Sequence, residues 1–150
     1  MSDRSLPPLD EADALSAPEA LSALDALVDA FSRTDTTAYF ACLAPQATFL
    51  FHGEPEVIAG RAAYQALWDS WVTDGWRVVG CESSDRQVQL LGSAAVVTHR
   101  VRTTIRTPEG EQRLDERETV VVARGDDDVV RVVHEHLSVT PSLETGTAGS

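Results

Sequence analysis

Residues 129–139 read Val-Val-Arg-Val-Val-His-Glu-His-Leu-Ser-Val, and this β-branched run predicts a strand over about 129–140. Three alternating runs precede it and predict strands over about 76–90, 93–107 and 112–125. The connections between the four runs are short and rich in Gly, Pro and Asp, which is typical of hairpin turns. We therefore expect one sequential antiparallel sheet in the C-terminal half of the chain.

The N-terminal half carries helical signals. Ser16 and Glu19 have the spacing of a capping box, and an apolar stripe at helical spacing follows them. The sequence predicts helices over about 16–33, 35–43 and 60–74, with short strands at 48–52 and 56–59. Helices followed by one long sheet are typical of the α+β class. We expect a flexible leader at 1–15, a single domain at 16–140 and a disordered tail at 141–150.

Charge and composition exclude several classes of partner. The 12 basic residues, all arginine, stand against 24 acidic ones, which gives a formal net charge of −12. This balance disfavours binding to nucleic acid or to an anionic membrane surface. No apolar run approaches the roughly 20 residues that span a bilayer, and the N-terminus lacks a signal-peptide pattern, so a cytoplasmic location is expected.

His99 is the first candidate for chemistry. In strand 93–107 the odd positions form the more apolar face, and His99 belongs to that face. If the odd face lines a cavity, desolvation lowers the pKa of the imidazole, and a neutral His99 can act as a general base or hydrogen-bonding group. Tyr39 is a second candidate, because its hydroxyl is expected near such a cavity. A Tyr–His pair suits polarisation of a carbonyl or enol.

His134 and His136 lie two residues apart, which places both imidazoles on one face of the last strand. The same face is predicted to carry Val130 and Val132, so at least one histidine is a candidate for the mouth of a pocket, His134 as a catalytic group and His136 as a ligand contact. A His-x-His pair supplies only two ligands of the three or four that a metal site needs. No metal and no cofactor are therefore expected. His52, at the end of the first short strand, is a further candidate ligand contact or a turn residue.

The third helix presents Tyr64, Trp68 and Trp71 on one face, as core residues that can also stack against a ligand. In the predicted strand 112–125, residues 116–118 read Glu-Arg-Glu, which we interpret as a solvated or interface segment. Cys42 and Cys81 have no metal-like spacing and are interpreted as small core residues.

The order of elements resembles the nuclear transport factor 2-like superfamily. The residues that carry the resemblance lie in four segments, 59–61, 103–110, 117–119 and 133–138. The more specific similarity is to its SnoaL-like and ketosteroid-isomerase-like small bacterial proteins, and the calcium/calmodulin-dependent kinase II association domain is similar too. The resemblance implies a cone of curved antiparallel sheet, closed by N-terminal helices around a deep pocket.

The sequence departs from the catalytic patterns of these relatives. Residues 44–47 read Ala-Pro-Gln-Ala, where a ketosteroid isomerase would need a carboxylate base. Residues 99–102 read His-Arg-Val-Arg, without the Asp-Arg-Asp set of a limonene epoxide hydrolase. The pocket arginines of the kinase association domain would fall near Val101 and Val121, which we expect to line the pocket as apolar contacts.

Our leading hypothesis is a homodimer, paired through the sheet face, that binds a small hydrophobic or polyketide-like molecule in its cone. The dimer is expected because the second face of the sheet also carries apolar residues, such as Val121 opposite Val120. One alternative is a cofactor-independent isomerase, cyclase or dehydratase with a pocket histidine as acid/base. The other is a non-catalytic association module. An open cavity that contains His99 favours the first two, and a core filled by Phe49, Trp68 and Trp71 favours the third.

Overall fold

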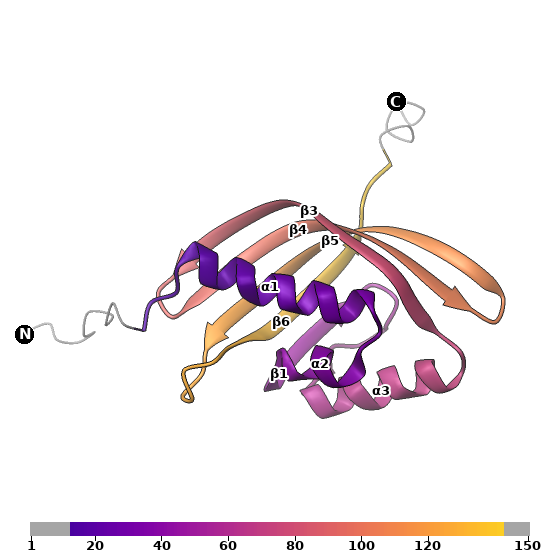
Figure 1. Cartoon of the computed structure of the whole chain (residues 1–150), viewed down its shortest axis with the longest axis horizontal. Helices are drawn as coiled ribbons and strands as arrows, with labels where there is room; N and C mark the ends of the chain where they lie inside the picture. Colours follow the sequence, from indigo (N-terminus) through magenta and orange to yellow (C-terminus); the bar gives the residue numbers. More distant parts are fainter. Residues whose placement is uncertain (1–12, 143–150) are drawn as a thin grey trace, which may run out of the picture.

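The computed structural model describes residues 13–142, so most of the expected leader and tail lies outside the described residues. Helices and strands follow in the order α1 (Ala17–Ser32), α2 (Thr36–Ala41), β1 (Leu43–Phe51), β2 (Ile58–Ala59), α3 (Arg61–Thr73), β3 (Arg77–Leu91), β4 (Ala94–Thr107), β5 (Gly110–Arg124) and β6 (Val130–Val139). Figure 1 shows α1 lying along the sheet, while α3 packs against β1 and β2. The α+β class expected from the sequence is confirmed.

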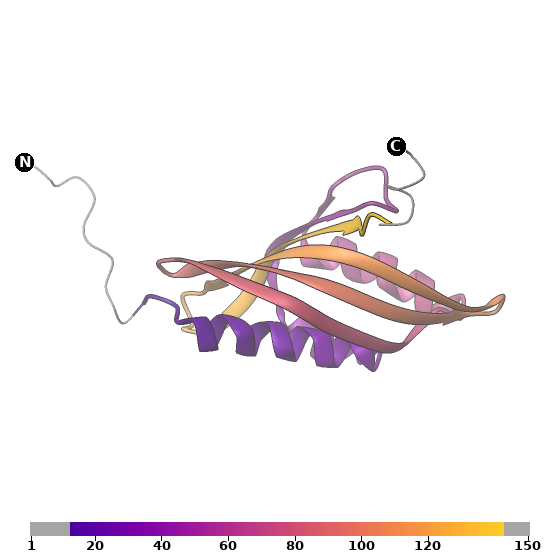
Figure 2. The ribbon, with the colours of Figure 1, turned by 90° about the horizontal axis from the view of Figure 1, so that it is seen from above.

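The six strands form one open, mixed sheet in the order β2-β1-β6-β5-β4-β3. Strands β3 to β6 pair sequentially and antiparallel, as predicted. Strand β1 pairs parallel with β6, so β6 lies inside the sheet instead of closing it. Figure 2 shows the long strands β3, β4 and β5 twisting as they run along the molecule.

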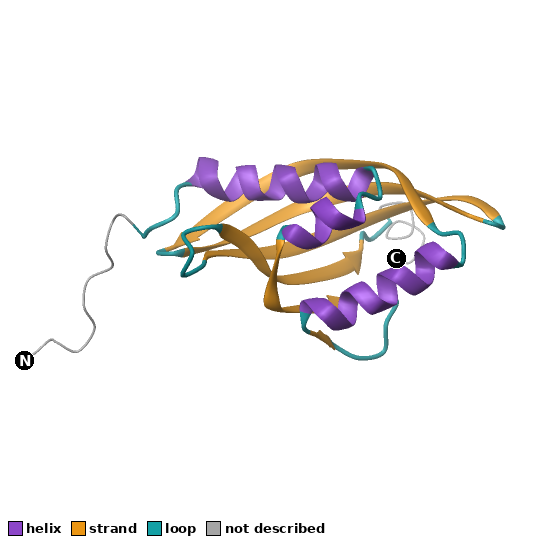
Figure 3. Cartoon of the chain, turned by 60° about the horizontal axis from the view of Figure 1, so that its bottom comes forward, coloured by secondary structure: helices purple, strands orange, loops and turns teal. Residues whose placement is uncertain are grey.

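All three helices cover the same face of the sheet (Figure 3), and the hydrophobic core lies between them and the strands. The capping box of α1 forms as predicted. The Glu19 N–H donates to Ser16 Oγ at 3.2 Å, and the Ser16 N–H donates to Glu19 Oε1 at 3.1 Å. Leu15 was expected in the leader, yet it is buried and its N–H donates to the Gly92 carbonyl at 2.7 Å. The ordered structure therefore begins before the helix cap.

The first strand is longer than predicted. It begins at Leu43, whereas the sequence pattern indicated a start at residue 48, and α2 ends at Ala41. Pro45 lies inside β1, although proline cannot donate to a strand ladder. The pairing of β1 with β6 is interrupted between Leu43 and Thr48, so Pro45 occupies a stretch where no donor is required.

A β-bulge in β6 decides which side chains face the helices. Val121 pairs with His134 but the next residue, Val122, pairs with Val132, so Val133 is an extra residue in the ladder. The bulge reverses the alternation: Val132 and Glu135 are both buried, while His136 is exposed. The prediction that His134 and His136 share a face with Val132 was therefore wrong, because simple alternation cannot anticipate an inserted residue.

Within residues 13–142, the structure contains no helix long and apolar enough to cross a membrane.

Candidate functional site

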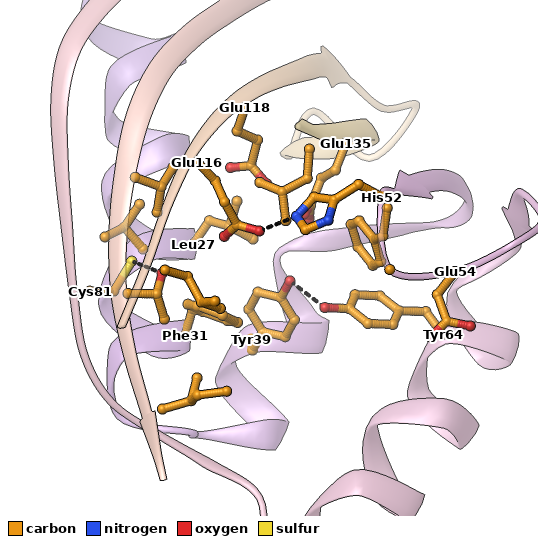
Figure 4. A pocket seen from close by; sticks show the side chains of 18 of the residues that line it. Leu27, Phe31, Tyr39, His52, Glu54, Tyr64, Cys81, Glu116, Glu118 and Glu135 are labelled. Carbon is orange, nitrogen blue, oxygen red and sulfur yellow. Dashed lines mark hydrogen bonds and ion pairs between the residues drawn. The ribbon is translucent and has the colours of Figure 1, made fainter. Parts of the chain in front are cut away.

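A cavity of about 300 Å³ lies between the helices and the covered face of the sheet (Figure 4). Most of its wall is apolar, with contributions from both the helices and the sheet: Leu27, Phe31, Phe51, Trp71, Trp76 and Val101. The predicted odd-numbered face of β4 is the one that lines this space, since Val97, His99 and Val101 are all buried. The core is therefore not filled, although Phe49 and Trp68 are fully buried beside the cavity.

Three glutamates form the polar end of the cavity. Glu116 and Glu118 project from β5 and Glu135 from β6, and the relative exposures of Glu116 and Glu135 are only 6% and 2%. Figure 4 shows their carboxyl groups gathered near His52, above the tyrosine pair. The interpretation of residues 116–118 as a solvated or interface segment was wrong for both glutamates, because strand alternation points Glu116 and Glu118 inward and only Arg117 outward.

His99 belongs to a hydrogen-bonded chain that crosses three strands. Its Nε2 lies 2.8 Å from Glu118 Oε1, directly opposite on β5. Its Nδ1 lies 2.7 Å from Ser83 Oγ on β3, and Arg86 Nε donates to the same oxygen at 2.9 Å. Because Arg86 already donates to Ser83 Oγ, the Ser83 hydroxyl proton is free for donation to Nδ1. The ring proton of His99 then sits on Nε2 and is donated to Glu118.

Burial lowers the pKa of His99 to about 4, with a further contribution from the Arg86 charge. This is the direction predicted from desolvation. At neutral pH the imidazole is uncharged. Both of its ring nitrogens already have partners, so it contacts a ligand less readily than Glu118 does.

Glu118 and Glu135 form a pair of buried carboxyl groups within hydrogen-bonding reach of each other. Burial raises the pKa of Glu118 to about 7, the nearby Glu116 charge adds to the rise, and the hydrogen bond with Glu135 opposes it. Burial and then the Glu118 charge raise the pKa of Glu135 well above its ordinary value. Two adjacent carboxyl groups in an apolar site hold at least one proton near neutral pH, which is the state suited to acid/base chemistry.

Two further contacts frame this carboxyl pair. His52 Nε2 lies 2.5 Å from Glu116 Oε2, and the partly exposed His52 side chain places this hydrogen bond at the rim. The hydroxyl groups of Tyr39 and Tyr64 lie 2.9 Å apart beneath the glutamates, and Tyr39 also reaches Glu135. Burial raises the pKa of both phenols well above the ordinary value, so both hydroxyls keep their protons.

The structure brings six of the ten predicted site residues to the cavity: Tyr39, His52, Tyr64, Trp71, His99 and Val101. The other four do not line it. Trp68 is fully buried in the core, where its Nε1 donates to Thr36 Oγ1 at 2.9 Å. Val121 alternates with the inward-facing Val120 and Val122, so it lies on the uncovered face of β5.

His134 and His136 also lie on the uncovered face, because of the bulge in β6. The Nδ1 of His134 is 2.8 Å from Thr48 Oγ1, and the His136 ring is exposed. Among residues 13–142, no group of three or more His, Cys, Asp or Glu side chains is placed to hold a metal ion. The Cys81 thiol does line the cavity, but burial raises its pKa to about 11, so it is a poor nucleophile there.

Sequence reasoning missed the three glutamates. For Glu116 and Glu118 a signal existed, because they lie at alternate positions on β5, the strand that pairs with β4. Residues directly opposite each other on paired strands face the same side of the sheet, so an inward-facing His99 requires Glu118, and with it Glu116, to face inward too. For Glu135 no such signal existed, because its orientation depends on the bulge.

A family model described as SnoaL-like domain matches residues 20–142. No curated protein sequence matches the chain closely enough to count as a relative.

Solved structures match over nearly the whole chain. A putative calcium/calmodulin-dependent protein kinase II association domain from Xanthomonas campestris is 21% identical, with a TM-score of 0.71, over 95% of this chain and 97% of that one. A nuclear transport factor 2-like superfamily protein from Salmonella enterica is 16% identical, with a TM-score of 0.72, over 84% and 92% of the two chains.

A ketosteroid isomerase-like protein from Erwinia carotovora is also 16% identical, with a TM-score of 0.69, over 85% of this chain and all of that one. At these identities the likeness shows the fold alone, and it confirms the cone-shaped, nuclear transport factor 2-like architecture predicted from the sequence.

Proposed function

Since the chain belongs to the SnoaL-like domain family, we propose that its cavity binds a small, largely apolar molecule and exchanges a proton with it. The reaction class is that of a cofactor-independent isomerase, cyclase or dehydratase, and a polyketide-like or other hydrophobic metabolite fits the apolar wall. The observation that carries the proposal is the buried Glu118–Glu135 pair at the end of an open, otherwise apolar cavity. Apolar clefts with a few convergent polar groups and perturbed pKa values are typical of active sites.

Glu118 is the group best suited to move a proton. A pKa of about 7 leaves it partly ionised near neutral pH, so it can accept a proton from a carbon next to a carbonyl and return it elsewhere. The neutral Glu135 carboxyl group and the Tyr39 hydroxyl are placed to donate hydrogen bonds to the enolate oxygen that forms. The proton removed from carbon resides on Glu118 until it is delivered, so no other reactant is required.

His99 is assigned a positioning role instead of the acid/base role expected from the sequence. Its Nε2 fixes one oxygen of Glu118, and Ser83 and Arg86 hold the ring in the tautomer that makes this possible. His99→Ala is thus expected to loosen Glu118 and to shift the pH dependence of turnover, in addition to reducing its rate.

A homodimer through the uncovered sheet face remains part of the proposal. Support comes from aliphatic side chains that pair across β4 and β5 on that face, Val96 with Val121 and Ala94 with Ala123. A protein that only associates through this face has no need of an open cavity with buried carboxyl groups, which favours the ligand-binding function over a pure association module.

The experiment follows deuterium incorporation into 2-tetralone and related small cyclic ketones in D₂O by NMR. The wild-type protein is expected to accelerate exchange next to the carbonyl, and Glu118→Gln is expected to reduce the rate about 100-fold or more. Glu56→Gln removes an exposed carboxylate that does not line the cavity and should leave the rate unchanged. Binding without exchange would reduce the protein to a binding module, and absence of binding by every ketone would contradict the proposal as a whole.

A further inference from the structure

We propose that the ligand of this cavity carries a protonated amine, which binds between Glu116, Glu118 and Glu135 while its apolar body lies against the aromatic wall. This inference rests on the proposed function in one respect, that the cavity is a ligand site. It specifies the charge of the ligand, which membership of the family does not determine.

The charges around the cavity favour a cation. Four glutamates line it, the three of the polar end and Glu54 near the rim, and no arginine or lysine is among its lining residues. The Arg86 guanidinium, which reaches His99 only through Ser83, is paired with Asp25 of α1 at 2.5 Å. An anionic ligand would face the repulsion of four carboxyl groups without an arginine among the lining residues to offset it, whereas an ammonium group would meet several acceptors.

An unused acceptor points to the same chemistry. Glu135 Oε2 is buried and has no hydrogen-bond partner among the described residues, although the Glu135 side chain lines the cavity. A buried polar atom without a partner is costly, and it is satisfied when a bound molecule supplies a donor. An alkylammonium group has three N–H donors and no acceptor, so it matches a cluster of carboxylate oxygens better than a hydroxyl or carbonyl does.

A bound cation would replace the proton that the Glu118–Glu135 pair retains. Without a ligand, Glu118 and Glu135 avoid charge repulsion by retaining a proton, as their raised pKa values indicate. A bound ammonium group neutralises the pair in place of that proton, so binding should release protons to solvent. The aromatic wall, which includes Phe31, Trp71 and Trp76, provides the apolar contact for the body of the ligand.

The pH dependence of binding depends on every titratable or charged group near Glu118. These groups come from all the elements packed around it: Tyr39, His52, Tyr64, Cys81, Arg86, His99, Glu116 and Glu135. Both tyrosines and Cys81 stay protonated through neutral pH, and His99 stays neutral. Affinity for an amine is therefore expected to rise between pH 6 and 8 as Glu118 ionises.

The test uses three probes with one bicyclic body: 2-aminotetralin, 2-tetralol and tetralin-2-carboxylate. Isothermal titration calorimetry is expected to show the amine binding at least tenfold more tightly than the alcohol, and the carboxylate more weakly than both. Titrations in two buffers of different ionisation enthalpy should show proton release with the amine and none with the alcohol. Amine affinity should increase several-fold from pH 6 to 8, while alcohol affinity stays constant.

Variants locate the effect. Glu135→Gln is expected to reduce amine affinity about tenfold without changing alcohol affinity, and Glu118→Gln serves as a second variant if the first fails to fold. Glu56→Gln, outside the cavity, should bind all three probes as the wild type does. Equal affinity for amine and alcohol, or tighter binding of the carboxylate, would overturn the inference and leave the proposed ligand site intact. If none of the three probes binds, the proposed function itself is contradicted.

Discussion

The protonation of Glu118 sets the chemistry of the cavity at the scale of single residues. Burial and the Glu116 charge disfavour its ionised form, while the hydrogen bond with Glu135 favours it. Burial dominates, and the pKa settles near 7. The same strand arrangement that brings His99 against Glu118 thus supplies both a positioned carboxyl group and a reason for it to exchange protons near neutral pH.

This raised pKa predicts a pH-dependent cost in stability. Between pH 4.5 and 7 the unfolded chain has released the Glu118 proton while the folded chain retains it, so the Glu118 contribution to the free energy of unfolding falls as pH rises. The full difference corresponds to about 3 kcal/mol. Glu118→Gln removes this loss. The free energy of unfolding of the variant, relative to that of the wild type, should therefore rise by up to about this amount between pH 4.5 and 7.

Urea denaturation at several pH values measures the difference between the two proteins. The contribution of His99 has the opposite sign, because its lowered pKa makes stability fall as pH drops from 6.5 towards 4, and it is present in both proteins. Glu56→Gln provides the exposed control and should track the wild type. Parallel curves for wild type and Glu118→Gln would show that Glu118 ionises normally in the folded protein.

At the scale of elements, α1 is the part whose local sequence most directly dictates its structure. Its N-terminus carries a complete capping box, and its apolar stripe buries Leu24 and Leu27 against the sheet. Strand β6 is the contrasting case, since the bulge at Val133 is a property of its pairing with β5 and not of its own residues. The polar end of the cavity depends on this pairing, because its three glutamates lie on β5 and β6, whereas α1 contributes to the apolar wall.

The α1 cap makes a quantitative prediction. Ser16→Ala removes the acceptor for the Glu19 N–H and should lower the free energy of unfolding by about 1 kcal/mol. Ser22→Ala, at an exposed position inside the same helix, is the matched control and should be neutral or slightly stabilising, because alanine has the higher helix propensity. Chemical denaturation distinguishes the two. An equal effect of both substitutions would mean that the cap contributes nothing specific.

At the scale of the whole molecule, the three helices cover one face of the sheet and leave the other face open. Val121 and Val96 lie opposite each other on that open face, with His136 exposed on β6. The proposed homodimer would cover these side chains. The cavity, on the helical side, would remain separate from such an interface.

Light scattering tests the dimer. The wild-type protein is expected at twice the chain mass at micromolar concentration. Val121→Asp should shift it to the monomer, because a desolvated carboxylate disrupts an apolar contact. Val72→Asp, an exposed position on α3 away from the sheet, should leave the dimer unchanged. A monomeric wild type would contradict the proposed assembly while leaving the cavity chemistry untouched.

Local sequence determined the elements of this protein. The period of hydrophobicity and the Gly, Pro and Asp turns predicted the three helices and the four long strands, because these signals act between neighbouring residues. Alternation in β4 was enough to place His99 in the cavity, since that strand pairs regularly with β5 along its whole length. The stretch 129–139 was correctly predicted as a strand.

Only the tertiary structure decided what that strand contributes to the site. The parallel pairing of β1 with β6 and the bulge at Val133 turn Glu135 inward and both histidines outward. Strand pairing involves residues far apart in the chain, and one inserted residue reverses every later orientation. For this reason a sequence that predicted a histidine site folds into one dominated by three buried glutamates.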